Sequence, residues 1–501
     1  MVATVIPKEA QGIATPFPVP APHRGLNTRE NFTVLQPTEA RVLENWLPDE
    51  GSCNVRPGYQ QHQTIAGATS VPTLVVYQGA SSQQLIAAGD GEIYDVTGTP
   101  SALSAASYAS DLWKTENFNG YLFGVNGQDT PWRHNGGGSV VATGFTGPTL
   151  TSLSTVKLIR ERLWFTENNS ADVYYGGLGS VTGALTTFQL SQIAAGGKCI
   201  ALGSWSRDAG DGSDDFTVFI MDTGQVIVYQ GDPATSFALV GKYNAPPLVE
   251  ADATVQIGGE RVLMTKSGPV PMTAVVAGVA FSPVALQDWG KIAPSWATDY
   301  QRYKANLGFN ARFIGGLAYF VFPTGTSTTK IYVYNTRIPA WTVYVGMPVS
   351  MFAELSGVTY FGSYSDSYVY SHATGSDNGS DITTLSRQGA IYPTNSRSSM
   401  QVNSFRPNID ANGPTNFNFG MDIDFQDGSL GTLHSVASDA TGMDWGDDWG
   451  SDWASPAVSR RKWYSARGYG RAVAPALRTT STASNVKWWS SDIMGNAGGR
   501  L

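Results

Sequence analysis

The chain has 501 residues and a formal net charge of −8, with 14% charged residues and 56 glycines. This length predicts two to four domains, or one large repeat body with an appendage. So few charges argue against long solvated helices, which rely on exposed Glu–Lys and Glu–Arg pairs, whereas Gly, Ser, Thr, Asn and aromatic residues favour strands and turns; we therefore predict an all-β protein.

Residues 1–25 are the first predicted element, a Pro- and Ala-rich arm that contains PFPVPAPH from Pro16 to His23. Proline keeps such a stretch extended, so the arm is either a free end or a clasp on a neighbouring molecule. The arm lacks the basic start and apolar run of a secretory signal. No run in the chain approaches the ~20 apolar residues of a membrane helix. We expect no membrane span, and a soluble protein made in a cytoplasm.

Residues 26–60 are predicted to lead from the arm into a repeat body. An Asn followed by an aromatic residue and a Pro, as in Asn45, Trp46 and Pro48, caps a turn and pins an extended segment. Arg56 is expected to pair with a carboxylate or with carbonyl groups where this segment meets the first repeat. These roles are structural and not catalytic.

Residues 61–375 are predicted to form a β-propeller. A recurring unit has a short apolar strand, a turn rich in Gly, Asn, Asp and Ser, and a second apolar strand, which is the pattern of a hairpin. The hairpins begin at Leu85, Gly120, Glu161, Phe216, Glu260, Gly316 and Gly357. Their spacing of about 35 to 55 residues suits four-stranded propeller blades of roughly 40–50 residues. We expect six or seven blades; the alternative is two or three unrelated β-sandwiches.

Residues 376–501 are predicted to form a C-terminal antiparallel β-sandwich-like domain. A polar linker precedes two alternating strand candidates that begin at Met400 and Thr415. The stretch MDWGDDWGSDWASP then places Trp445, Trp449 and Trp453 four residues apart, among several aspartates. We interpret these rings as a structural or interface seam. A sugar-binding platform and a metal loop are the alternatives.

Residues with catalytic spacing are scarce. The five histidines lack metal-ligand spacing, and neither a nucleophile elbow nor a phosphate-binding loop occurs. Asp211, Ser213 and Asp215 alternate like calcium ligands, but the rest of an EF-hand pattern is missing, so an exposed acidic turn is the preferred interpretation. Cys53 and Cys199 are expected to be small core residues. We expect no enzyme activity and no cofactor.

The segment from Pro37 to Tyr59 carries a resemblance to a known family. Its pattern is an Ala, then Leu-x-Asn-aromatic-x-Pro, then Arg-x-Gly, and the matching residues are Ala40, Leu43, Asn45, Trp46, Pro48, Arg56 and Gly58. In this pattern the segment resembles the opening of tail nozzle proteins of short-tailed bacteriophages, also called tail tubular protein B or packaged-DNA stabilisation proteins.

The resemblance implies a structural protein of the virion tail, assembled in the cytoplasm of the host bacterium. Six copies would form a ring below the tail adaptor, continue the portal channel, retain packaged DNA and let it out on infection. Tail fibres or spikes would be further partners. Genomic DNA would pass the lumen without sequence-specific binding, because an acidic or neutral wall does not hold phosphate. A closed ring needs head-to-tail interfaces, which we expect from the arm and the Trp-rich domain.

A second function stays open from the sequence. The chain would then be a glycan-binding or glycan-cleaving, sialidase-like propeller adhesin. That alternative predicts a free monomer, a pocket on the propeller axis and sugar binding through clustered tryptophans. Paired carboxylates for glycoside hydrolysis are available among the 40 Asp and Glu residues, but no pair stands out.

Overall fold

The computed structural model describes residues 15–104, 107–208, 213–392, 398–412, 415–436, 462–482 and 485–500. The chain divides into two compact units. Residues 57–378 form one, here called the propeller unit, and residues 1–56 with 379–501 form the other, here called the terminal unit. Strands dominate both units, which confirms the all-β prediction.

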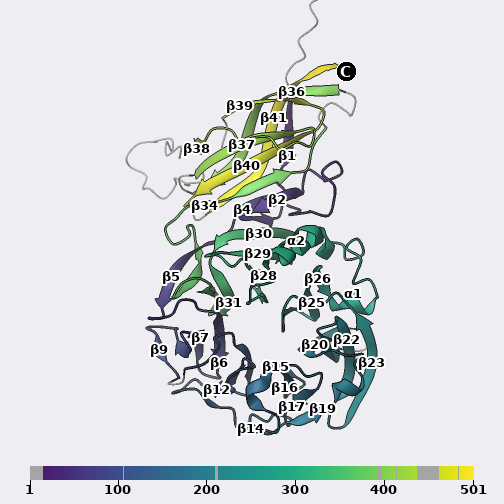
Figure 1. Cartoon of the computed structure of the whole chain (residues 1–501). Coiled ribbons are helices and arrows are strands. Elements are labelled where there is room, and N and C mark those ends of the chain that lie inside the picture. Colours follow the sequence, from purple (N-terminus) through teal and green to yellow (C-terminus); the bar gives the residue numbers. More distant parts are fainter. Residues whose placement is uncertain are drawn as a thin grey trace, which may run out of the picture. The chain divides into compact units, whose positions relative to one another are not determined.

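In the described residues, the propeller unit contains seven antiparallel sheets that follow one another around a ring (Figure 1). The first three blades consist of β6 (Thr73–Gln78), β7 (Gln83–Gly89), β8 (Glu92–Asp95) and β9 (Ser101–Ala102); of β10 (Lys114–Phe118), β11 (Tyr121–Val125), β12 (Trp132–His134) and β13 (Val141–Ala142); and of β15 (Leu153–Ile159), β16 (Arg162–Glu167), β17 (Val173–Tyr175) and β19 (Thr186–Phe188). The short strands β14 (Phe145–Thr146) and β18 (Gly183–Ala184) pair in parallel beside the third blade.

The remaining four blades complete the ring. They consist of β20 (Cys199–Asp208), β21 (Ser213–Met221), β22 (Gln225–Asp232) and β23 (Ser236–Asn244); of β24 (Thr254–Ile257), β25 (Glu260–Thr265) and β26 (Gly268–Pro271); of β27 (Asn310–Ile314), β28 (Leu317–Pro323), β29 (Thr329–Asn335) and β30 (Ala340–Met347); and of β31 (Val349–Leu355), β32 (Val358–Ser363), β33 (Tyr368–Thr374) and β5 (Gly58–Thr64). The propeller prediction is therefore confirmed, with the larger of the two expected blade numbers.

The ring is closed by strands from the two ends of the unit. β5 comes from the start of the unit and pairs with β33 near its end. β31 of the seventh blade packs against β6 of the first. Such closure leaves few free sheet edges, which protects a β protein from edge-to-edge association.

Turn chemistry accounts for several of the hairpins. Asp90 and Gly91 both have positive φ, and so do Asn119 and Gly120, as tight primed turns require. The apolar faces of the blades then pack on one another; Trp164 of β16, for example, contacts Phe219 of β21 with ring centroids 5.6 Å apart. Local turns thus set each blade, and aromatic packing joins neighbouring blades.

The fifth blade departs from the four-stranded prediction. After β26 the chain forms α1 (Met272–Val276), the 3₁₀ turn η3 (Trp289–Ile292) and α2 (Ala293–Tyr303) in place of a fourth strand. Trp296 of α2 is fully buried, and its indole Nε1 donates to the carbonyl of Thr265 at 2.8 Å. Among the helices of the described residues, none combines the length and apolar character needed to cross a membrane.

Among its described residues, the terminal unit contains two antiparallel sheets. The first has the order β3 (Trp46–Asp49), β4 (Ser52–Val55), β41 (Val486–Arg500), β36 (Ser398–Ala411) and β39 (Tyr464–Gly470), and β1 (Thr15–Pro20) also pairs with β41. The second has the order β2 (Ala40–Glu44), β35 (Leu385–Gln388), β40 (Val473–Ser481), β37 (Thr415–Ile423) and β38 (His434–Val436), and β34 (Ile382–Thr383) also pairs with β40. Phe405 and Phe419 stack between the sheets at 4.5 Å, as in a sandwich.

Both ends of the chain build this unit, whereas the sequence predicts a domain from residues 376–501 alone. β36 covers one edge of β41 along its length, so β4 and β1 share the other edge, at Lys487–Trp488 and Ser490–Gly495. The arm predicted for residues 1–25 is thus extended at Thr15–Pro20, where it is a paired strand. Residues 26–56, expected to lead into the propeller, supply β2, β3 and β4 to the terminal unit. β5, from Gly58, is the first strand of the propeller unit.

Candidate functional site

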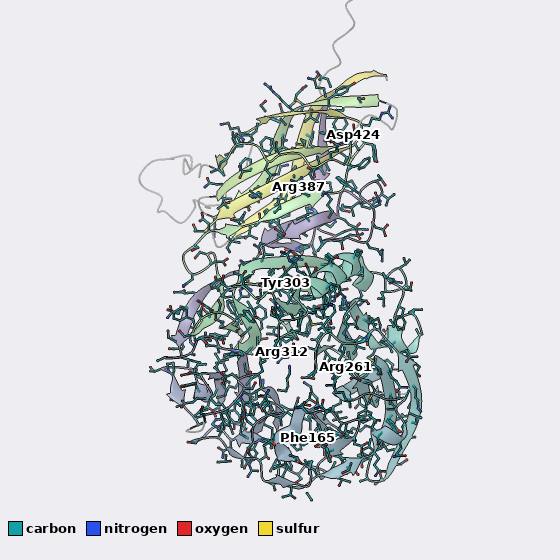
Figure 2. All side chains as sticks on the ribbon, viewed as in Figure 1. Phe165, Arg261, Tyr303, Arg312, Arg387 and Asp424 are labelled. Carbon is teal, nitrogen blue, oxygen red and sulfur yellow. The ribbon has the colours of Figure 1, made fainter. Side chains whose placement is uncertain are left out.

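The candidate site is a cavity of about 340 Å³ on the inner side of the ring of blades. Residues of five blades, the second to the sixth, line it, which places it on the propeller axis; we call it the axial cavity. Figure 2 shows two of its side chains, Arg261 and Arg312, on the inner side of the ring. The lining residues are Glu116, Lys157, Leu158, Gly203, Ser204, Thr254, Val255, Gln256, Arg261, Ala311, Arg312 and Phe313.

Arg261 reaches the axial cavity by crossing from the fifth blade to the fourth. Its Nε donates to the carbonyl of Ser204 at 2.8 Å, and its Nη1 donates to Thr254 Oγ1 at 2.9 Å. Gly203 permits this crossing, because a Cβ at that position would lie 2.3 Å from the guanidinium carbon. Burial lowers the pKa of this guanidinium, so the protein holds a charge there at a cost in desolvation.

Arg312, on β27 of the sixth blade, is the second guanidinium. Its Nη1 donates to the carbonyl of Ala311 at 3.0 Å, and its Nη2 contacts the thioether sulfur of Met351 at 3.1 Å. Thioether sulfur is a weak acceptor. Within the described residues, neither Arg312 nor Arg261 forms an ion pair with a carboxylate. Two cations of the axial cavity thus have no anionic partner of their own.

The other charges of the site are nearly balanced. Lys157 Nζ lies 3.0 Å from Asp252 Oδ2, in an ion pair that neutralises both. Glu116 is half-buried, and desolvation by burial raises its pKa to about 7. The positive charges of Lys157, Arg261 and Arg312 oppose that shift, while Asp252 adds to it. The cluster therefore carries one excess positive charge when Glu116 is ionised and two when it is protonated.

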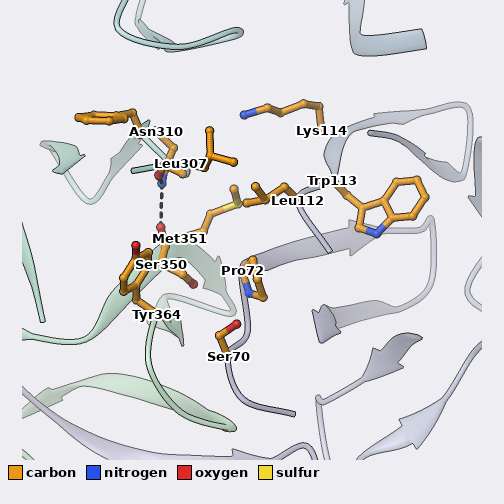
Figure 3. A pocket seen from close by; sticks show the side chains of 12 residues that line it. Ser70, Pro72, Leu112, Trp113, Lys114, Leu307, Asn310, Ser350, Met351 and Tyr364 are labelled. Carbon is orange, nitrogen blue, oxygen red and sulfur yellow. Dashed lines mark hydrogen bonds between the residues drawn. The ribbon is translucent and has the colours of Figure 1, made fainter. Parts of the chain in front are cut away.

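An apolar pocket of about 130 Å³ lies where the inner strands of the first, second, sixth and seventh blades begin (Figure 3). Leu112, Trp113, Phe309 and Met351 are among its lining residues. Asn310 Nδ2 donates to the carbonyl of Ser350 at 2.7 Å and ties the sixth blade to the seventh beside it. Because Met351 also contacts Arg312, one side chain connects this pocket with the axial cavity.

The residues of the N-terminal motif form a buried structural node in the terminal unit. Asn45 has a φ of 58°, and its side-chain oxygen accepts from Arg56 Nε at 2.9 Å. Asn45 Nδ2 donates to the carbonyl of Thr383 at 2.8 Å. Arg56 is 2% exposed, and the Asn45 oxygen that accepts from it belongs to the terminal unit and not to the first blade, where the sequence predicts its partner.

Trp46, Pro48 and Gly58 also have structural surroundings. Trp46 is fully buried and lies against Trp488, with ring centroids 5.4 Å apart. Pro48 stands opposite Cys53 in the β3–β4 hairpin. Gly58 lies in β5 of the propeller unit, where a Cβ would come within 2.2 Å of the carbonyl oxygen of Ser376. The structure thus brings Asn45, Trp46, Pro48 and Arg56 into one hairpin region and places Gly58 in the other unit.

The other residues singled out in the sequence lie partly outside the described structure. Trp445, Trp449 and Trp453 lie outside the described residues, as does Asp211. Ser213 and Asp215 belong to β21, and Asp215 Oδ1 accepts from Ser206 Oγ at 2.5 Å across the hairpin. In the part of the chain that the structure describes, no three His, Cys, Asp or Glu side chains are placed to hold a metal ion. Cys53 and Cys199 are both buried thiols.

Comparison with known proteins finds only distant structural similarity. No protein-family model and no curated protein matches the chain. Among solved structures, U3-55K is 11% identical over 63% of this chain and 99% of its own, with a TM-score of 0.38. The RRP9 WD40 repeats are 11% identical over 64% and 98%, with a TM-score of 0.39. YCF48, bound to a D1 peptide, is 11% identical over 63% and 97%, with a TM-score of 0.39.

The lining residues of the axial cavity share no motif in the sequence. Glu116, Lys157 and Arg312 come from separate strands of three blades, so no short motif contains two of them. The only signal available is a charged residue within the first strand of a predicted blade. A propeller turns such positions toward its axis, which becomes visible only when the blades are ordered in the ring.

Proposed function

We propose that this protein is a structural component of a short-tailed phage virion that forms the tail nozzle ring. The observation that carries the proposal is the buried node of Asn45, Trp46 and Arg56. These residues carry the resemblance to nozzle proteins, and their hydrogen bonds and ring packing fix a scaffold. A motif whose residues build a scaffold suits a family whose members act by assembly and not by chemistry.

The terminal unit is the proposed place of subunit contact. It presents large aromatic side chains to solvent, with Tyr469 55% and Trp489 42% exposed. Trp489 Nε1 donates to Asp410 Oδ2 at 2.6 Å, and Lys487 Nζ lies 4.3 Å from the centre of its ring, so the indole is held in one orientation. Oriented aromatic residues favour protein interfaces. In the proposed ring, the closed propeller would thicken the wall around a lumen through which DNA passes without being bound.

Electron microscopy of negatively stained particles tests the ring. The purified chain is imaged alone and after mixing with the portal–adaptor assembly of its phage. We expect rings with an axial channel in at least one of the two samples, and these images would also give the symmetry, proposed to be sixfold. Monomers in both samples at micromolar concentration would contradict the nozzle function.

The axial cavity favours a second candidate function, a glycan-binding propeller. The cavity is concave and mixes apolar walls with a few polar groups, as small-ligand sites do. Of its lining residues, all within the described part of the chain, Glu116 is the only carboxylate, whereas glycoside hydrolysis generally uses a pair. This composition favours binding over cleavage. A glycan array probed with the purified, labelled chain tests the candidate, and the absence of any bound glycan would contradict it.

A further inference from the structure

We propose that the axial cavity binds the carboxylate of a small polyhydroxylated acid, of the size and chemistry of an acidic monosaccharide. The inference rests on the second candidate function, because it names the ligand class of the same cavity. It does not depend on ring formation. Four features of the cavity support it: two guanidinium groups without anions, an unused amide oxygen, an apolar wall and the available volume.

The guanidinium groups supply the anion-binding element. A guanidinium has five N–H donors, and the contacts described above use two on Arg261 and two on Arg312. Each group therefore keeps three donors, and both groups line one cavity. Because the Lys157–Asp252 pair is already neutral, the excess positive charge belongs to these two arginines. Guanidinium groups match the planar fork of a carboxylate, which makes this the anion of choice.

Gln256 favours a ligand that carries hydroxyl groups. Its Nε2 donates to the carbonyl of Gly258 at 2.8 Å, which fixes the orientation of the amide. Its Oε1 is then a buried acceptor that has no hydrogen-bond partner in the described residues. An unpaired buried acceptor is unfavourable, so the site gains when a ligand donates a hydrogen bond to it. A ligand hydroxyl meets that need, while a carboxylate oxygen would be repelled.

The remaining wall and the volume fit a sugar ring. Leu158, Val255 and Phe313 give the cavity an apolar side, and Phe313 is 37% exposed. The C–H face of a monosaccharide packs well on such a surface. The cavity volume of about 340 Å³ lies near the lower end of known ligand sites, roughly 300–1,000 Å³. This is room for one sugar unit, either free or at the end of a glycan.

Glu116 makes the binding dependent on pH. When ionised, it repels a ligand carboxylate; when protonated, it becomes a donor to it. Its pKa of about 7 places this change near neutrality. The charged groups that surround it are Lys157, Asp252, Arg261 and Arg312. Affinity for an acidic sugar should therefore rise as the pH falls from 8 to 6.

Isothermal titration calorimetry on the full chain tests the inference, with D-glucuronate as the probe and D-glucose as the neutral control. We expect glucuronate to bind, with at least tenfold tighter binding than glucose, and tighter at pH 6 than at pH 8. Arg312→Gln should weaken glucuronate binding at least tenfold. Arg302→Gln, which removes an exposed arginine on α2, should leave the affinity unchanged.

Three results would overturn the inference: no glucuronate binding, equal binding of both sugars, or an unchanged affinity in the Arg312→Gln variant. If Arg312→Gln does not fold, judged by circular dichroism, Glu116→Gln serves instead. That variant should bind glucuronate more tightly at pH 8 and lose the pH dependence, and a retained dependence would contradict the proposed site. Neutral glycans that bind while glucuronate does not would leave the glycan-binding function standing and remove this inference alone.

Discussion

The side chain of Asn45 does two tasks that no other common residue combines. Its positive φ of 58° suits Asn or Gly better than a residue with a larger Cβ branch. Its amide accepts from Arg56 and donates to the carbonyl of Thr383, both over distances under 3 Å. Removal of that amide would leave the Arg56 guanidinium, which is 2% exposed, without this acceptor.

We predict that Asn45→Ala lowers the free energy of unfolding by about 2–4 kcal/mol, because backbone strain adds to the loss of buried hydrogen bonds. Urea denaturation followed by tryptophan fluorescence measures the change. Asn45→Gly removes the strain but not the hydrogen-bond loss, so it should fall between Ala and wild type. Equal stability of all three proteins would mean that the node contributes nothing to the fold.

Glu116 is predicted to make the fold less stable as the pH rises. Its pKa of about 7 in the folded chain exceeds the value of about 4.3 in an unfolded chain, so the folded state binds the extra proton between these values. Stability from this group is therefore full below about pH 4.3, falls as the pH rises to 7 and is constant above. Glu116→Gln should stabilise the chain by about 1–2 kcal/mol at pH 8 and by much less at pH 5, as thermal melts at both pH values would show.

At the scale of elements, turn residues made the hairpins predictable. Asp90–Gly91 marks the tip of the hairpin predicted from Leu85, and both residues have the expected positive φ. The turn at Arg160–Glu161, at the start of the hairpin predicted from Glu161, has positive φ at both residues without a glycine, so no turn residue marks it in the sequence. α2 was not predicted at all, because its stabilisation comes from distant contacts: Trp296 packs on Phe322 at 4.7 Å, and Tyr332 donates to Asp299 at 2.6 Å.

The anchoring of α2 gives a prediction at this scale. Trp296→Ala should destabilise the chain by about 3–5 kcal/mol, since it leaves a large cavity and removes the hydrogen bond to the Thr265 carbonyl. Arg302→Ala on the exposed side of the same helix is the control and should change stability by less than about 0.5 kcal/mol. Urea denaturation of both variants measures the difference. Similar values for the two would show that α2 does not support the fifth and sixth blades.

Ring closure by β5 depends on Gly58. An alanine Cβ there would meet the backbone of Ser376 at 2.2 Å, and backbone atoms cannot yield as a side-chain tip can. We predict that Gly58→Ala lowers stability by about 1–3 kcal/mol and increases amide hydrogen exchange in β5 and β33. Gly98→Ala, at a position with no atom within 4 Å of the added Cβ, should do neither. Unaltered exchange in both strands would show that β5 tolerates the shift.

For the whole molecule, long-range pairing limited what the sequence could predict. The repeat of hairpins predicts a closed propeller, because each blade is local in sequence. The terminal unit joins β1 at Thr15–Pro20 to β41 at Ser490–Gly495, and no local pattern selects that partner. The axial cavity also depends on residues that are distant in sequence, because Glu116, Arg261 and Arg312 become neighbours only after the blades close into a ring.

In the proposed nozzle the arm has two alternative roles, one through residues 1–14 and one through β1, which pairs with β41 of the same chain. If residues 1–14 clasp a neighbouring subunit, their removal alone should abolish rings while the melting temperature stays unchanged. If the arm acts through β1, only removal of residues 1–25 should abolish rings. That deletion uncovers an edge of β41 at Ser490–Gly495, and it should also lower the melting temperature and promote aggregation.

We predict the second outcome, because β1 is paired along its whole length, from Thr15 to Pro20. Size-exclusion chromatography with light scattering on both truncations, followed by thermal melts, distinguishes the two roles. Rings that persist without residues 1–25 would exclude both and move the subunit contact to other parts of the terminal unit.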